Sequence, residues 1–501
     1  MNIVWFKRDL RLEDNEIFLE ASQDGPILPL YIIEKELWLQ PDLTGRHYNF
    51  LKQCLDELDQ SLRNYGGKLI IRVGDAVQIL AELKDKHSAA KLYSHQETWN
   101  GWTFSRDAQV RAWARKTNVH WIEKAQNGVI RGLSSRNGWS AKWYSSMNKP
   151  ASQKPTHIEF VNERADSIPT NSELKLDDDE LYHAPKGGRT EAKKLLNSFL
   201  NSRGEKYRSE MSSPLTAIDS CSRLSPHIAF GTISIKEIYH STTNRLQDLK
   251  DNSTHPAKDW IQSLKSFSSR LRWHCHFIQK LESEPEIEFR NMNSCYDGLR
   301  EHCFNRIYFE AWKSGHTGYP MIDACMRFLT ATGWLNFRMR ALLISFSSQH
   351  LWLHWREPSL HLAGLFTDYE PGIHYSQTQM QSGTTGINTI RIYNPIKQGL
   401  DQDPTGTFVR QWVPELKNID PDFIHTPWLS PSKPKGYPPP IVDEKTSRQK
   451  ASKKLYAVKR KPEHKEIATE VYIKHGSRKG KQTTRGTRIS LKNKLQGELN
   501  L

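Results

Sequence analysis

The first 125 residues alternate between short apolar runs and amphipathic segments. Five apolar runs have the length and the β-branched content of strands. They are Ile3–Phe6, Ile27–Ile33, Lys68–Val73, Lys91–His95 and Val119–Glu123. The segments between them, at 48–62, 76–83 and 107–116, carry apolar residues at helical spacing. Strands that alternate with helices predict a doubly wound parallel sheet, so we expect an α/β domain over residues 1–130.

The pattern changes after the fifth apolar run. Between Asn127 and Gly188 periodicity fades into Ser, Asn, Lys and Pro, so we expect a connector over 131–188 that wraps the surface. Helical spacing returns at Arg189 and continues, interrupted by Gly and Pro, to about Val442. A large all-α domain is therefore predicted over 189–450. After that the chain becomes polar and basic, which predicts a disordered tail over 451–501.

Charge adds a partner class to this picture. The net charge is +15 and the pI is near 9.3, which favours an anionic partner such as nucleic acid. Residues 453–501 hold 14 Lys or Arg and 4 Asp or Glu, so most of the excess lies in the tail. A DNA site on the body must therefore come from local clustering of cations, and the tail is a candidate surface for a protein partner.

The cysteines indicate a compartment. Six are scattered without a C-x-x-C pair, and no secretory signal precedes them, so we expect reduced thiols. Because no window has 18 apolar residues and the chain opens directly on a strand, we expect a soluble cytoplasmic protein without a membrane partner, or a nuclear one if the source is eukaryotic. Cys275 lies between two histidines, and we interpret it as a helix interior and not as a metal site.

Charged residues inside an apolar pattern indicate a buried ligand. From Trp334 to Pro395, arginines and carboxylates stand among apolar and aromatic residues at helical spacing. Charge in such a place is costly unless it is paired or meets a polar ligand, which favours a buried polar cofactor.

Several runs within about 1–456 resemble the photolyase/cryptochrome family. They are KRDLRLEDN after the first strand (Lys7–Asn15), TGYPMIDACMRFLTATGW (Thr317–Trp334), Ile392–Leu416, IHTPW (Ile424–Trp428) and YPPPIVD (Tyr437–Asp443). The resemblance implies FAD in the helical domain. It also implies that the α/β domain can hold an antenna pigment of folate or deazaflavin type, although a sheet with an empty cleft is an equal alternative.

A hydroxyl-rich turn before a helix start predicts a phosphate cradle. Ser222 and Ser225 stand there, and an ordinary helix cap is the alternative. The turn resembles the family's T-S-x-L-S pyrophosphate motif, with Cys221 in place of Thr and with Arg223 and Leu224 inside it. Tyr207 matches a family tyrosine that packs on the same ligand.

The resemblance also assigns residues around the flavin ring. Arg340 and Asp368 match a family pair beside the ring, with the pinning of two helices as the alternative role. Glu370 takes the place of the second carboxylate, and His374 stands where the family faces flavin N5. Asn394, together with Arg391, is expected to line the cavity.

The lesion pocket departs from the family's repair enzymes. Trp273, which would stack on a flipped-out base, is kept, and so is Arg338. Arg270 replaces a carboxylate that contacts the pyrimidine, Phe337 replaces an asparagine, and Met380 replaces a tryptophan. We expect these positions to contact DNA through an altered pocket.

The family's relay of three tryptophans is also incomplete. Trp355 holds the middle position, but Thr378 stands at the inner one and His302 at the outer one. We expect slow photoreduction, or another aromatic donor. The candidates by proximity in sequence are Tyr375, Tyr393, Trp334 and Trp352.

Three functions remain open. The leading interpretation is a blue-light-driven, FAD-dependent photolyase-type lyase that repairs pyrimidine dimers in damaged DNA by electron transfer from excited reduced flavin. The second is a cryptochrome photoreceptor without repair. The third is a nucleic-acid-binding flavoprotein that has lost its light chemistry.

Overall fold

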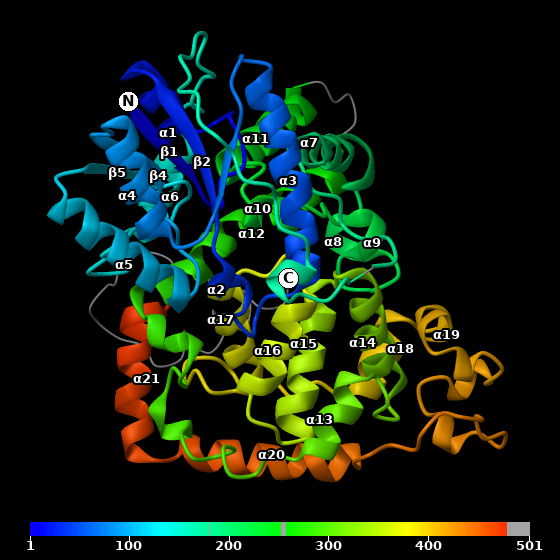
Figure 1. Ribbon diagram of the computed structural model, residues 1–501. Coiled ribbons are helices and arrows are strands. Elements are labelled where there is room, and N and C mark those ends of the chain that lie inside the picture. The colour runs from blue at the N-terminus through cyan, green and yellow to red at the C-terminus, as the bar shows by residue number, and fades with distance from the viewer. Residues whose placement is uncertain (180, 252–256, 478–501) are drawn as a thin grey trace.

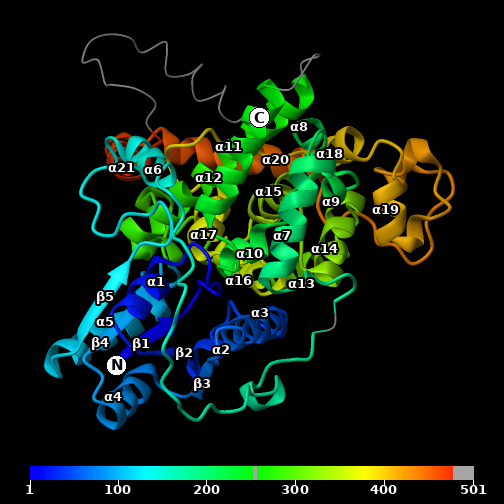
Figure 2. The same ribbon diagram turned by 90° about the horizontal axis from the view of Figure 1, so that it is seen from above.

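The computed structural model describes residues 1–179, 181–251 and 257–477 (Figures 1 and 2). Within these ranges five strands form one parallel sheet in the order β3-β2-β1-β4-β5. The strands are β1 (Asn2–Phe6), β2 (Ile27–Ile33), β3 (Ile70–Val73), β4 (Lys91–His95) and β5 (His120–Lys124). Every predicted strand is confirmed. The order reverses between β1 and β4, and ligands of doubly wound folds bind outside the strand ends at such a switch point.

Helices cover both faces of the sheet, as a buried parallel sheet requires. Ile3 and Trp5 of β1 pack with α4 (Ala76–His87) and α5 (Gly101–Lys116). Val4 and Phe6 point to the other face, where they pack with α1 (Glu16–Gln23) and α3 (Gly45–Arg63). That second core continues into the helical domain without a break, so α3 lies between the two domains. A short helix, α2 (Lys35–Trp38), precedes α3.

Part of the predicted connector is a helix. α6 (Trp139–Met147) forms because Trp139, Trp143 and Met147 recur at helical spacing. They are buried against α11 (Ile235–Asp251) and α12 (Lys258–Ser283). Farther on, Phe160 forms an isolated parallel bridge to Ile27 at the start of β2. The connector is therefore anchored to both domains.

The rest of the described chain is helical. The helices after the connector are α7 (Arg189–Ser198), α8 (Tyr207–Glu210), α9 (Ala217–Ser220), α10 (Ser225–Ala229), α11 (Ile235–Asp251), α12 (Lys258–Ser283), α13 (Arg306–Lys313), α14 (Pro320–Thr332), α15 (Phe337–Ser345), α16 (Arg356–Leu365), α17 (Pro371–Ser382), α18 (Pro395–Gln402) and α19 (Thr407–Trp412). π-helical turns follow α7 and α15, at Phe199–Arg203 and Phe346–His350. Short 3₁₀ turns lie at Ser172–Leu174, Pro285–Glu288, Ser294–Tyr296, Pro414–Leu416, Pro421–Phe423 and Pro427–Leu429.

The predicted start of disorder at residue 451 is wrong. It falls inside α20 (Glu444–Lys459), and α21 (Pro462–His475) follows. In Figure 1, α20 runs along the bottom of the helical domain and α21 runs upward along its left side. Leu455 and Val458 bury one side of α20, and Lys474 of α21 pairs at 3.0 Å with Glu284, the residue directly after α12 (Lys258–Ser283). The remainder of the predicted tail, 478–501, lies outside the described residues.

Two further expectations meet the structure here. Cys275 is buried within α12, which confirms the helix-interior interpretation. In the described part of the chain, no helix combines the length and the apolar character that a membrane crossing needs.

Candidate functional site

A two-bonded ion pair joins α15 to the loop after α16. Nη1 and Nη2 of Arg340 donate to Oδ1 and Oδ2 of Asp368 at 3.0 and 2.8 Å, and Nε donates to the carbonyl of Leu335 at 2.6 Å. The guanidinium lies 4.0 Å from the ring centroid of Phe366. A bidentate pair of this kind fixes both groups in their charged forms and in one orientation. The structure therefore brings the predicted arginine and aspartate together.

Cations gather beside this pair. Four guanidinium groups lie within electrostatic range of the Cys221 thiol and oppose the burial that raises its pKa to about 12. They belong to Arg203, Arg223, Arg270 and Arg340. Burial lowers the pKa of Arg223 to about 10, and Asp368 is the carboxylate that acts against this shift. Such an excess of positive charge fits a dianionic diphosphate, so the residues present are suited to the pyrophosphate of FAD.

Arg223 lies in a strained turn. Its backbone has φ 61°, in the left-handed region that residues other than glycine rarely adopt. Its guanidinium lies 4.1 Å from the ring centroid of Trp334, and it forms no hydrogen bond or ion pair within the described residues. Arg203 holds the turn by donating to the carbonyls of Asp219 and Ser222 at 2.7 and 3.1 Å. A half-buried arginine held in this way is available to an anion.

The two predicted serines do not cap α10. The cap position is Leu224, without a side-chain capping bond, and Ser225 is the first helical residue. The hydroxyl of Ser222 accepts from the amide of Leu224 at 3.4 Å. The ordinary-cap alternative is therefore wrong, and because α10 has 5 residues its dipole is weak. Phosphate binding by these serines stays a prediction, and the arginines supply the charge.

Tyr207 contacts Arg270, one of the four arginines near the Cys221 thiol. Burial raises the pKa of Tyr207 to about 12, and its side chain is hydrogen-bonded to Arg270. The ring packs edge-on against Phe199 at 5.6 Å. The guanidinium of Arg270 also lies 5.4 Å from the ring centroid of Phe337. Arg270 thus joins the arginines of the predicted cofactor site as well as the predicted DNA pocket.

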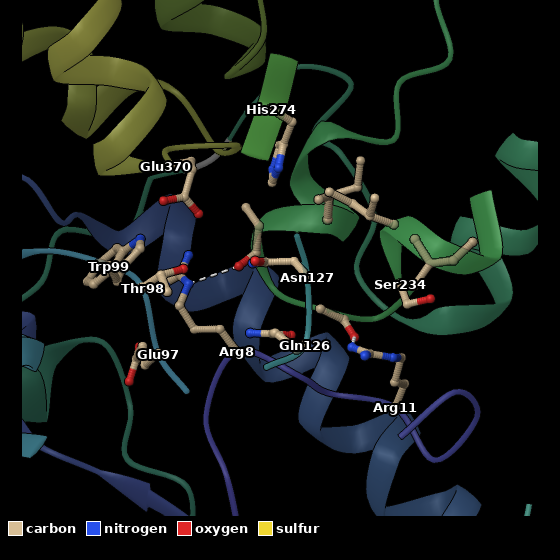
Figure 3. Close-up of a pocket in the computed structure, with 15 residues that line it drawn as sticks. Arg8, Arg11, Glu97, Thr98, Trp99, Gln126, Asn127, Ser234, His274 and Glu370 are labelled. Atoms are coloured by element: carbon tan, nitrogen blue, oxygen red, sulfur yellow. Dashed lines mark hydrogen bonds between the residues drawn. The ribbon is translucent and has the colours of Figure 1, made fainter. Parts of the chain in front are cut away.

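Glu370 points into a cavity between the domains (Figure 3). The cavity measures about 30 Å³ and lies beyond the ends of β1 and β4, at the switch point. Burial raises the pKa of Glu370 to about 7 against the attraction of Arg8, and Oε1 has no hydrogen-bond partner within the described residues. Arg8 donates to the carbonyl of Ala229 at 2.9 Å and lies 4.0 Å from the ring centroid of Trp99. The predicted second carboxylate therefore faces the α/β domain, and neither member of the Arg340–Asp368 pair lines this cavity.

His374 is held by Ser359. Its Nε2 lies 2.8 Å from the Ser359 carbonyl, which only accepts, so Nε2 carries the proton and Nδ1 is the acceptor. Burial lowers the pKa of His374 to about 4. The ring therefore stays neutral at physiological pH and offers Nδ1 as a hydrogen-bond acceptor, and its position facing flavin N5 stays a prediction. Thr378, which also bonds Ser359, is buried beside it.

Trp355, Tyr375 and Tyr369 form a row of neighbouring aromatic side chains. Nε1 of Trp355 donates to Asn291 at 2.7 Å, and its ring lies 6.4 Å from that of Tyr375. The hydroxyls of Tyr375 and Tyr369 are 3.1 Å apart, and Tyr369 donates to Asp42 at 2.6 Å. Because Tyr369 has one hydroxyl proton, Tyr375 is the donor in their shared bond. Trp355 is thus buried next to one of the candidate replacement donors, and sequence reasoning missed Tyr369 and Asp42.

The predicted DNA residues lie on three helices. Trp273 is half-buried on α12, and its ring lies 5.4 and 5.5 Å from those of His276 and Phe277. Met380 is half-buried on α17 and Arg338 is half-buried on α15. The cavity that Trp273 lines together with Arg136 and Arg272 contains neither Met380 nor Arg338, and the cavity at Glu370 contains none of the three. A shared lesion pocket therefore stays a prediction.

Asn394 is the N-cap residue of α18. Its side-chain oxygen caps α18 by accepting from the amide of Lys397 at 2.9 Å. The oxygen is therefore occupied, which leaves the amide nitrogen as the group that can reach a cofactor. Contact between Asn394 and FAD stays a prediction.

Comparisons with known proteins place these features in a family. A family model described as DNA photolyase matches residues 2–160, and one described as the FAD binding domain of DNA photolyase matches residues 267–457. Arg340 and Asp368 fall inside the second range. Tyr207 and the Ser222–Ser225 turn lie outside both.

Relatives and solved structures extend over most of the chain. A deoxyribodipyrimidine photo-lyase of Streptomyces griseus is 28% identical and covers 88% of this chain and 96% of its own. Cryptochrome-2 of Arabidopsis thaliana is 27% identical, and the match covers 90% of this chain and 78% of that protein. A class III photolyase from Agrobacterium tumefaciens superposes with a TM-score of 0.78 at 28% identity over 92% and 98%. An archaeal photolyase from Sulfolobus tokodaii with two FAD molecules superposes with a TM-score of 0.75 at 27% identity. The match covers 91% of this chain and 100% of that chain.

Proposed function

The chain belongs to the photolyase/cryptochrome family, and on this premise we propose that it is a blue-light-driven, FAD-dependent DNA photolyase that repairs pyrimidine dimers. The observation that carries the proposal is the bidentate Arg340–Asp368 pair within the range that matches an FAD-binding domain. When bound, FAD supplies the light-excited electron that splits the lesion.

The protein's own groups bind and orient the cofactor. Arg340 and Asp368 hold each other charged, so each keeps polar edges for the flavin ring. Arg223, which has no carboxylate bonded to it in the described chain, takes the diphosphate charge together with Arg203 and Arg270. His374 stays neutral and offers Nδ1 as an acceptor. Preorganised polar groups in a water-poor site of this kind are the usual contribution of a protein to cofactor chemistry.

On the substrate side we assign DNA contact to Trp273, Arg338 and Met380. Trp273 offers a partly exposed indole for a base taken out of the stack. Arg338 contributes a cation for a phosphate, and the exposed ring of Phe337 beside it extends an apolar surface.

A specific observation favours the second candidate, a cryptochrome photoreceptor without repair. Arg270, at the position of a base-contacting carboxylate, is engaged by Tyr207 on the cofactor side. A cation there offers no acceptor to the exocyclic donors of a pyrimidine. The similarity to Cryptochrome-2 of Arabidopsis thaliana supports this candidate as well.

A second chromophore also remains part of the proposal. The Sulfolobus tokodaii photolyase with two FAD molecules supports it. The cavity at the switch point, about 30 Å³, has room for about two water molecules and not for a pigment. A second chromophore would therefore need another place.

The test of function is a repair assay. Purified protein is mixed with oligonucleotides that contain a cyclobutane dimer or a (6-4) product, and restored bases are scored under blue light and in the dark. Light-dependent loss of the cyclobutane dimer supports a photolyase. Flavin photochemistry without restored bases would favour the photoreceptor.

A further inference from the structure

The start of α3 holds three consecutive carbonyl oxygens of the helical domain. These oxygens belong to Gly364, Leu365 and Phe366, at the end of α16 and directly after it. Carbonyls in the last turn of a helix have no partner within that helix, so their donors must come from elsewhere. Here the donors lie 319 or 320 positions earlier in the chain, and α3 stands above α15 and α16 in Figure 1. The contact therefore joins the two domains.

Two of the donors are the hydroxyl of Thr44 and the guanidinium of Arg46. Thr44 is the N-cap residue of α3, and its hydroxyl donates to the first of these carbonyls at 2.7 Å. Nη1 of Arg46 donates to the second carbonyl at 2.7 Å, and Nη2 donates to the carbonyl of Thr330 on α14 at 3.3 Å. Arg46 is buried, so the bonds that it makes have no competition from bulk water.

The third donor is His47, and the structure fixes its tautomer. Nδ1 of His47 accepts from the amide of Thr44 at 3.1 Å, so Nε2 carries the proton. Nε2 donates to the carbonyl of Phe366 at 2.9 Å. Burial lowers the pKa of His47 to about 3. The ring therefore stays neutral at physiological pH and keeps both of its bonds.

The same segment also contacts the residue after Asp368. The hydroxyl of Tyr369 donates to Asp42 at 2.6 Å, and its ring lies 6.2 Å from that of His47. Asp368 itself is within electrostatic range of His47. Residues 42–47 of the α/β domain thus hold the chain on both sides of Asp368.

The connector closes over the start of α3. Nε of Arg46 donates to the carboxylate of Asp179 at 2.6 Å. A Cβ at Gly45 would lie 2.0 Å from the carbonyl oxygen of Asp177, so this approach needs a glycine. The connector therefore presses the donors of α3 against the helical domain.

The orientation of Asp368 depends on contacts from outside its own loop. The bidentate bonds to Arg340 need a carboxylate held in one orientation. Residues 366–370, between α16 and α17, form neither helix nor strand. Two backbone bonds flank Asp368, from the amide of Thr367 to Gly333 at 3.0 Å and from the amide of Tyr369 to the carbonyl two residues before Asp368 at 2.9 Å. The α3 donors add three further bonds directly before this turn.

We propose that Thr44, Arg46 and His47 are positioning residues of the cofactor site. By holding the three carbonyls before Asp368, they present its carboxylate to Arg340 and to the cofactor. Tight binding of the cofactor by the helical domain then requires the contact with α3 of the α/β domain. The proposal rests on the proposed function for the identity of the cofactor, FAD, and it needs neither light nor DNA.

The test compares Thr44→Val, which removes one donor at nearly unchanged shape, with Thr44→Ser, which keeps it. The matched control is Tyr48→Phe, which removes a bond of 2.7 Å from the same helix to the carbonyl of Pro169, away from the loop. Hydrogen exchange of residues 364–370 is measured by mass spectrometry on the full-length protein with excess FAD. The rate at which bound FAD dissociates in the dark is measured by the rise of flavin fluorescence on dilution.

Thr44→Val is expected to raise both rates about fivefold or more, because a buried carbonyl loses its partner and the loop opens more often. Thr44→Ser and Tyr48→Phe should keep both rates of the wild type. Thr44→Val combined with His47→Leu leaves only one of the three donors and should have a larger effect than Thr44→Val alone.

Several results would overturn the proposal. They are unchanged exchange of 364–370 in Thr44→Val and in the double variant, faster exchange without faster loss of FAD, and equal effects in Tyr48→Phe. Thermal unfolding checks that each variant is folded, and Thr44→Val alone decides if the double variant is not. A wild type that binds no FAD counts against the proposed function, whereas the exchange rates still decide whether α3 holds the loop.

Discussion

Arg340 and Asp368 form two parallel hydrogen bonds, of 3.0 and 2.8 Å, between α15 and the loop that leads to α17. The aspartate side chain is 3% exposed and the arginine side chain 27%. Each charge therefore depends on the other in a place where water reaches only one side. This pair links the packing of the helical domain to its proposed cofactor.

Removing the carboxylate is expected to destabilise the fold. Asp368→Ala leaves Arg340 without its partner, a change that costs about 3–5 kcal/mol when the pair is buried. We expect about 3 kcal/mol, the low end, because Arg340 is partly exposed. Chemical unfolding measures the loss. Asp401→Ala, at the exposed pair with Lys397, is the control and should cost about 0–1 kcal/mol. Similar losses for both variants would contradict the assignment.

The buried glutamate predicts a pH dependence of stability. Burial raises the pKa of Glu370 to about 7 in the folded protein, from an ordinary value of 4.5. Between these values the folded state keeps a proton that the unfolded state releases, so this group's contribution to stability is complete at low pH and is lost as the pH rises through 7. The glutamine side chain of Glu370→Gln cannot ionise, so this variant does not lose stability in this way as the pH rises.

The stability of Glu370→Gln relative to the wild type is therefore expected to increase between pH 5 and pH 8, as thermal unfolding can measure. Glu288 and Lys280 also have a pKa of about 7, but both proteins contain them, so their effect cancels in the difference. A difference that stays constant with pH would show that Glu370 is ionised in the folded state throughout.

The rate at which blue light reduces the flavin is expected to depend only weakly on Trp355. Thr378 interrupts the family relay, and Tyr375 lies 6.4 Å from Trp355 with its hydroxyl bonded toward Asp42 through Tyr369. Trp355→Phe should therefore slow the blue-light bleaching of oxidised flavin by much less than tenfold, and Tyr375→Phe by more. Near-total loss of bleaching in Trp355→Phe alone would make Trp355 the obligatory donor.

Restoring a tryptophan at position 378 is expected to fail. Thr378 is 2% exposed and bonded to Ser359, so an indole has no room there. Overpacking of this kind typically costs about 1–3 kcal/mol. Thr378→Trp should lower the melting temperature without speeding photoreduction. Faster bleaching at unchanged stability would show that the site can enlarge.

The tail is expected to add salt-sensitive binding to DNA. Truncation after Ser477 removes this segment and keeps both α20 and α21. Loss of the basic segment 478–501 should flatten the dependence of log K on log salt. An unchanged slope would favour a protein partner for the tail.

The sequence specified the sheet well and the outer helices poorly. The five strands are short apolar runs whose periodicity is read directly. α6 was missed because its indoles at 139 and 143 stand among Ser, Lys and Asn, and α20 because its mean composition is polar although Leu455 and Val458 are buried. The deciding contacts come from α12 and from neighbouring loops, which a local pattern does not contain.

The candidate site likewise combines contacts that the sequence predicts with contacts that it does not reveal. The Arg340–Asp368 pair was predicted because both motifs resemble family patterns, and the structure brings the two together. The bond from Tyr369 to Asp42 joins residues 327 positions apart, so no local signal reveals it. The direction of Glu370 toward Arg8 likewise depends on how the two domains pack.

The most direct test of the account is the FAD content of the purified protein and of Asp368→Asn, a variant of nearly unchanged shape that removes the negative charge beside Arg340. FAD released by heat is quantified per chain, and circular dichroism confirms that each protein is folded. The account predicts about one FAD at this site in the wild type and in Asp401→Ala, and a large loss in folded Asp368→Asn. Equal FAD in folded Asp368→Asn and wild type would contradict the placement of the cofactor at the Arg340–Asp368 pair.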